Sequence, residues 1–280
     1  MILLFLIWTT GFEYLSVDPI AGRGSMGYAL SGDGYSLNYN PAGLALNEIN
    51  HYSISYLNYI CNTHFGYLGL EKKQLGLGIK YFYSGRIKKT DAMGNEYGYF
   101  GTNFIDLNIG QGFFLKNFII GASLKLVYEN IDSLSSFGLG CDIGGLYIFP
   151  VEKIQTGFTI KNIGTALKPF IEEKEIFPYE IDLAIAKQFN NGWFGIDLVK
   201  QSLTNFGIRL GGRYDINPIF CVIASYTSLL SQIKMQSGLD FLAGLNIGFA
   251  IKKSPIAINY VYAPYFTLGQ GHKITIKLGG

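Results

Sequence analysis

Charged residues and long apolar runs are both scarce in this sequence. Asp, Glu, Lys and Arg together make up 15% of the 280 residues, against roughly 25% in ordinary soluble domains. The longest uninterrupted apolar run is Met1–Trp8, which is far shorter than the roughly 18 residues that a transmembrane helix needs. Hydrophobic residues nevertheless account for 49% of the chain, so the apolar content is dispersed along its length.

Motifs for catalysis, metal binding and nucleic-acid binding are also lacking. His51, His64 and His272 are far apart, and no G-x-S-x-G sequence occurs. The three cysteines form no C-x-x-C pair, which leaves disulfide-framework and zinc interpretations without support. A net charge of +2 gives no basic footprint for nucleic acid. We therefore expect a protein that is not an enzyme, with no metal, no cofactor and no nucleic-acid partner.

Glycine and aromatic residues, in contrast, are abundant. The chain has 36 Gly, 20 Tyr and 21 Phe, a composition that disfavours helices and favours strands. From about residue 51 onward, apolar residues alternate with polar residues or glycine; Leu75, Leu77 and Ile79, for example, share one face of a strand. This pattern predicts fourteen strands, near 51–60, 64–71, 74–84, 103–113, 118–128, 137–149, 154–162, 179–189, 193–200, 205–214, 218–226, 238–251, 255–262 and 271–279.

The connections between these strands alternate in length. Those after even-numbered strands are short, and most of those after odd-numbered strands are long, the longest being 85–102 and 163–178; the first and ninth connections are short exceptions. Outer-membrane barrels have an even strand number, short periplasmic turns and long outward loops, whereas a soluble sandwich has no reason to sort loops in this way. Aromatic clusters near strand ends, such as Tyr81-Phe82-Tyr83, are typical of an interfacial girdle. We therefore predict an all-β fold, a transmembrane antiparallel β-barrel of about 14 strands over residues 51–280, which lies in the lipid of the bacterial outer membrane.

The first 50 residues differ from the rest of the chain in composition and pattern. Residues 1–19 contain the apolar run and are expected to be an export signal or an N-terminal lead-in. Residues 20–50 are rich in glycine and include the turn sequence Asn40-Pro41-Ala42-Gly43. A barrel of fourteen strands is wider than one that its own side chains fill. We therefore expect the glycine-rich segment to pack in or under the lumen as a plug or hatch, with a simple periplasmic lead-in as the alternative.

The sequence IAGRGSMGYALSGDGYSLNYNPAGLALN at 20–47 resembles the N-terminal signature of the PorV/PorQ family of outer-membrane barrels, which is related to the FadL fatty-acid transporters. The loop from Gly85 to Phe100 resembles the loop after that family's third strand, and the segment from Tyr265 to Ile274 resembles its closing hairpin. Gly32-Asp33-Gly34 and Tyr39 depart from the acidic pair and the Trp that are common before the Asn-Pro. The loops are also short for PorV itself, which puts a role that depends on long loops in doubt.

Two sets of residues are candidates for function. The plug or hatch candidates are Asp33, Asn38, Asn40, Pro41, Ala42 and Gly43, with the two asparagines expected to bond strand backbones. The lumen-facing candidates are Arg209, Arg213, Asp106, Asp142 and Asp240. Arg209 and Arg213 lie four residues apart on one strand face and are expected to hold a carboxylate or a phosphate. A lattice of structural ion pairs across the strands is the simpler alternative for these charges.

Three functions remain open. The PorV/PorQ resemblance implies a non-enzymatic partner in protein secretion or surface attachment, whose partners are secretion-system proteins or their cargo. The alternative is a FadL-like transporter that moves a hydrophobic ligand across the outer membrane. The third is a soluble β protein that binds lipid.

Overall fold

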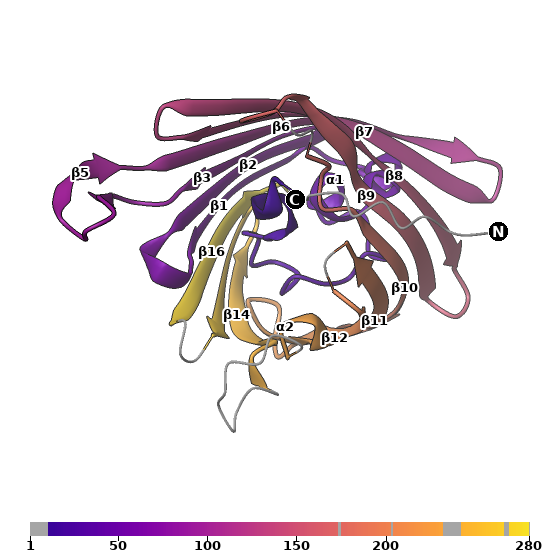
Figure 1. Ribbon diagram of the computed structural model, residues 1–280. Helices are drawn as coiled ribbons and strands as arrows, with labels where there is room; N and C mark the ends of the chain where they lie inside the picture. Colours follow the sequence, from indigo (N-terminus) through magenta and orange to yellow (C-terminus); the bar gives the residue numbers. More distant parts are fainter. Residues whose placement is uncertain (1–10, 173–174, 203, 232–241, 266–268, 280) are drawn as a thin grey trace.

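The computed structural model describes residues 11–172, 175–202, 204–231, 242–265 and 269–279. In these residues fourteen antiparallel strands close into one barrel, so the predicted fold is confirmed (Figure 1). Neighbours in the chain are neighbours in the sheet, β3 pairs with β6, and β1 pairs with β16 to close the ring. The barrel strands are β1 (His51–Asn58), β2 (His64–Lys72), β3 (Leu75–Tyr83), β6 (Thr102–Leu115), β7 (Phe118–Ile131), β8 (Leu134–Phe149), β9 (Ile154–Lys168), β10 (Glu180–Phe189), β11 (Gly192–Gln201), β12 (Phe206–Asp215), β13 (Phe220–Thr227), β14 (Leu245–Lys253), β15 (Ile256–Pro264) and β16 (Gln270–Leu278).

The barrel is apolar outside and polar inside. In β1, Tyr52 and Ile54 face outward and are 50% and 58% exposed, whereas Ser53 and Ser55 face the lumen and are 2% and 3% exposed. The same alternation recurs around the ring, because successive side chains of a strand point to opposite faces. A closed ring leaves no unpaired strand edge and its apolar exterior matches lipid, so this barrel is built to span a membrane.

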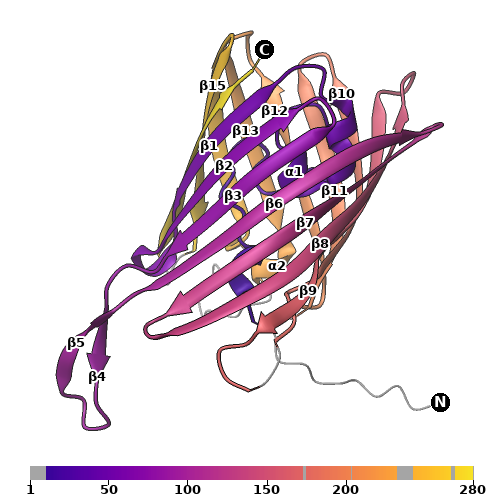
Figure 2. The ribbon, with the colours of Figure 1, turned by 90° about the horizontal axis from the view of Figure 1, so that it is seen from above.

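Short and long connections lie at opposite ends of the barrel (Figure 2). The turns 73–74, 116–117, 150–153, 190–191, 216–219 and 254–255 share the end at which β1 starts and β16 finishes, which is the periplasmic end of such barrels. At the other, outer end, the first and ninth connections are short, as the sequence indicated, and the connection 132–133 is a further short one. It was expected to be longer, but β7 and β8 both extend beyond their predicted limits and leave two residues between them.

The connection after β3 contains structure that the sequence did not predict. Instead of an irregular loop, β4 (Ile87–Thr90) and β5 (Glu96–Phe100) pair as a separate two-stranded sheet, which projects away from the barrel in both views (Figures 1 and 2). The expected strand 238–251 is also shifted, because β14 begins at Leu245, and residues 238–241 lie outside the described residues.

The N-terminal segment runs through the interior of the ring (Figure 1). It contains the 3-10 helix η1 (Glu13–Ser16), the single-turn helix α1 (Ser36–Tyr39) and the 3-10 helix η2 (Pro41–Leu46). Two further short helices, η3 (Ile60–Asn62) and α2 (Ser228–Ser231), lie in the outer connections. Among the described residues, no helix is long and apolar enough to cross a membrane. The proposed export signal falls mainly on residues 1–10, which are outside the described residues.

Candidate functional site

The η2 element rests directly on a glycine-lined part of the inner wall. A Cβ atom added at Gly112 of β6 would overlap the backbone nitrogen of Ala45, and one added at Gly121 of β7 would overlap that of Ala42. Glycine at these wall positions therefore lets one backbone approach another closely. The candidates Pro41, Ala42 and Gly43 are all buried in this contact.

Asn40 joins η2 to two strands. Its side-chain Oδ1 accepts a hydrogen bond from Ala42 N at 3.1 Å and so caps the helix start, where Pro41 occupies the first helical position. Its Nδ2 donates to Tyr28 O at 3.0 Å and to the strand carbonyls of Gly145 and Phe158 at 3.2 and 3.4 Å. One amide thus ties the turn to the segment before it and to β8 and β9.

Asp33 holds a second turn of the segment through Arg23. The Arg23 guanidinium is fully buried and donates to both carboxylate oxygens of Asp33, with Nε to Oδ2 at 2.7 Å. The guanidinium also lies 4.8 Å from the centre of the Tyr39 ring. Burial disfavours the charged form of Asp33, but the nearby Arg23 charge outweighs this effect and lowers the pKa of Asp33 to about 2. The pair therefore stays ionised throughout the neutral pH range.

Two lumen lysines hold backbone carbonyls of the segment. Lys80 of β3 donates to Leu15 O at 3.3 Å and Val17 O at 3.1 Å, and Lys161 of β9 donates to Asn38 O at 2.7 Å. The Asn38 side chain donates to Asp18 Oδ1 within the segment, at 3.0 Å. Asn38 therefore contacts the wall through its carbonyl, whereas the expectation placed that contact on its side chain.

Asp106 and Asp142 belong to a buried lattice of opposite charges. Asp106 lies directly across from Lys80 in the β3–β6 register. Asp142 forms an ion pair with Lys125, with Oδ2 and Nζ 2.9 Å apart, and its Oδ1 accepts a hydrogen bond from Asn162 N at 2.7 Å. The Asp142 carboxylate is thus bound to groups of the chain itself, whereas Asp106 Oδ1 is buried without a hydrogen-bond partner.

Arg209 and Arg213 engage separate partners. Arg209 is buried and forms ion pairs with Glu180 at 2.7 Å and Asp182 at 2.8 Å, and its guanidinium lies 5.0 Å from the centre of the Tyr28 ring. Arg213 is partly exposed and pairs with a carboxylate of its own strand, that of Asp215, at 3.2 Å. The expected shared site for one anion is thus replaced by three ion pairs, two of Arg209 and one of Arg213. The remaining lumen candidate, Asp240, lies outside the described residues.

The outer mouth of the lumen is filled by apolar and aromatic side chains that pack against one another. Phe82 and Phe104 are stacked with ring centres 5.0 Å apart, and the Tyr14 ring of η1 lies 4.9 Å from Phe104. Of the expected girdle residues Tyr81 to Tyr83, Phe82 therefore points into the lumen. The cluster, which we call the mouth cluster, consists of Phe12, Tyr14, Leu15, Val17, Leu57, Tyr59, Phe65, Phe82, Phe104, Val127, Ala166 and Phe177.

Several of these partners were not predicted. The inward glycines had a visible signal, since they alternate with apolar residues. Phe177, which packs on the inner face of the barrel against Gly138 and Gly164, had none, because it comes from a connection that folds back into the mouth. Among the described residues, no three His, Cys, Asp or Glu side chains are placed to hold a metal ion.

Comparison with known proteins shows the fold. No family model matches this sequence, and no curated protein matches it. Among solved structures, the toluene transporter TodX of Pseudomonas putida aligns with a TM-score of 0.57 and 13% identity over 94% of this chain and 98% of TodX. A FadL homologue of Pseudomonas aeruginosa aligns with a TM-score of 0.54 and 10% identity over 92% of this chain and 96% of that one. The chain therefore has the fold of the FadL-like outer-membrane β-barrels.

Proposed function

We propose that this chain is a FadL-like transporter that lets hydrophobic small molecules cross the bacterial outer membrane. The observation that carries the proposal is the mouth cluster. Porin lumens are polar and filled with water, whereas ligand sites for apolar molecules are lined mainly by hydrophobic and aromatic side chains. An apolar inner mouth such as this one favours an apolar solute.

The structural neighbours support the same class of solute. One is described as a toluene transporter, and a variant of it as a monoaromatic hydrocarbon channel, which aligns with a TM-score of 0.56 and 11% identity over 87% of this chain. The secretion role that the PorV/PorQ resemblance implies gains no such support. We therefore prefer the transport alternative, with the segment 20–50 as the plug that controls the path.

The contacts of the segment suggest how its parts divide this role. The η2 element is wedged against glycines of β6 and β7, and Tyr28 and Ala29 lie similarly close to Gly157 of β9. Near the start of the segment, Lys80 instead holds the carbonyls of Leu15 and Val17 by polar contacts. Polar contacts can be replaced by water at small cost, whereas the wedge cannot move without opening a void. We infer that residues 20–46 are the fixed part of the plug and that residues 11–18 form the movable end.

Uptake of a labelled hydrocarbon into liposomes tests the proposal. The full chain should raise toluene uptake above that of protein-free liposomes. Phe104→Ser should weaken the apparent affinity about three- to tenfold, because an aromatic contact contributes about 0.5–1.5 kcal/mol. Phe113→Ser on the outward face of the same strand is the matched control. Toluene uptake no faster than in empty liposomes, together with loss of surface-attached proteins in a deletion strain, would instead favour the secretion role.

A further inference from the structure

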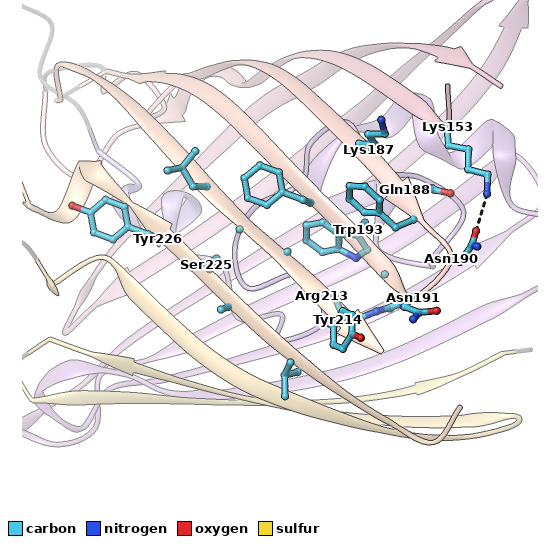
Figure 3. A pocket seen from close by; sticks show the side chains of 18 of the residues that line it. Lys153, Lys187, Gln188, Asn190, Asn191, Trp193, Arg213, Tyr214, Ser225 and Tyr226 are labelled. Carbon is cyan, nitrogen blue, oxygen red and sulfur yellow. Dashed lines mark hydrogen bonds between the residues drawn. The ribbon is translucent and has the colours of Figure 1, made fainter. Parts of the chain in front are cut away.

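An apolar groove of about 1050 Å³ runs along the outer surface of β11, β12 and β13 (Figure 3). Its floor is made by two small residues, Gly212 and Ala224, which lie directly across from one another in the β12–β13 register. By strand alternation both face outward, as do the larger neighbours Phe194, Leu210 and Tyr214. The outer wall is therefore hollowed where side chains are missing and flanked by rings and branched chains.

The groove has a basic end. Two exposed lysines line it. Lys187 lies near the end of β10, and Lys153 lies in the turn before β9. Both are at the end of the groove opposite Tyr226 (Figure 3). Lys153 Nζ donates to Asn190 Oδ1 at 3.0 Å, and Glu152 is the one acidic residue in the described lining. Because the turns 150–153 and 190–191 are short connections, this end lies at the periplasmic surface of the membrane.

A second apolar groove on the outer wall has no basic end. It has a volume of about 750 Å³ and crosses the outward face of β1, β2, β3, β6 and β7, where residues such as Ile54, Leu77 and Leu124 line it. None of its described lining residues is charged. Acyl chains of any lipid fit such a surface, and nothing there distinguishes one headgroup from another.

We propose that the groove on β11–β13 binds an anionic phospholipid of the periplasmic leaflet. An acyl chain lies along the floor at Gly212 and Ala224, and the phosphate lies between the ammonium groups of Lys153 and Lys187. Lysine side chains at a membrane surface extend toward the headgroup level, and each basic residue there attracts anionic lipid by about fivefold. A free inorganic anion leaves the apolar floor unused, and an uncharged transport substrate leaves the two lysines unused.

Phospholipid binding goes beyond the proposed transport function and requires only that the barrel lie in a membrane. The test uses the full chain in detergent micelles, titrated with equal amounts of phosphatidylglycerol and phosphatidylcholine, and counts the bound lipids by native mass spectrometry. We expect the wild type to retain phosphatidylglycerol at least about tenfold better. The double variant Lys153→Gln, Lys187→Gln should lose most of this preference.

Two matched controls complete the experiment. Lys73→Gln combined with Lys116→Gln removes two lysines from other periplasmic turns and should leave the preference intact. Ala224→Trp fills the groove and should lower retention of both lipids, whereas Ala122→Trp, on the outward face of β7, should not. Equal retention of the two lipids by the wild type, or equal loss of the preference in the two lysine variants, would overturn the proposal.

Discussion

Replacing Gly121 with alanine should loosen the N-terminal segment from the barrel wall. The new methyl group would overlap Ala42 N and the carbonyl carbon of Pro41, and both are backbone atoms that cannot rotate away. Overpacking of this kind costs about 1–3 kcal/mol. Gly145→Ala is the matched control, because Gly145 faces outward on β8 and its added methyl would come no closer than 3.9 Å to Ile119 O.

The two variants gain equally from the restricted unfolded chain, by about 0.4–1 kcal/mol. The difference between them therefore isolates the overpacking, and we expect Gly121→Ala to be less stable than Gly145→Ala by about 1–3 kcal/mol. Urea unfolding in phosphatidylcholine vesicles, followed by the mobility of unboiled samples on a gel, measures this difference. Planar-bilayer recordings should also show higher conductance for Gly121→Ala. Equal urea midpoints and equal conductance in the two variants would refute the close contact between η2 and β7.

Two further predictions concern the polar contacts of the segment. Asn40→Ala removes the helix cap and the amide donor to the carbonyls of Tyr28 and Gly145. It should lower the free energy of unfolding by about 1–3 kcal/mol. Asn38→Ala removes one side-chain hydrogen bond and should lower the free energy of unfolding by less in the same urea assay. The pKa of Asp33 is held at about 2 by Arg23, below its usual value of about 4, so the ion pair contributes its full stability above pH 4 and loses it as the pH falls toward 2. Protease cleavage of the segment should rise over that interval in the wild type, and a pH-independent cleavage rate there would contradict this role of the pair. Asp33→Asn should already be cleaved faster at neutral pH.

The barrel itself was predictable because strand periodicity is a local property. In each strand, alternate residues face inward and outward, so the polarity pattern identifies the two faces. The length of a connection indicates the end of the barrel at which it lies. Errors arose where a local pattern was weak or ambiguous. The pair β4 and β5 is short, and the limits of β7 and β8 depend on pairing between strands that only the closed ring sets.

The sequence also marked which residues line the lumen, but not their partners. The alternation of residues along each strand is enough to place Arg209, Asp106 and Asp142 on inward faces. It cannot say that Arg209 of β12 reaches across β11 to Glu180 and Asp182 of β10 and stacks on Tyr28, because those contacts join segments that are distant in the chain. The same holds for Arg23 and Asp33, whose pairing depends on how a glycine-rich turn folds back on itself.

The amino-acid sequence by itself therefore determined the class of fold, the number of barrel strands and the end of the barrel at which most short turns lie. Only the tertiary structure decided what fills the lumen and where the outer wall is hollow. The alternation of apolar and polar residues recurs in every strand, so an irregularity in one strand does not hide the class of fold. The fit of η2 on Gly112 and Gly121, and the groove at Gly212 and Ala224, each depend on a few residues that closure of the ring brings together.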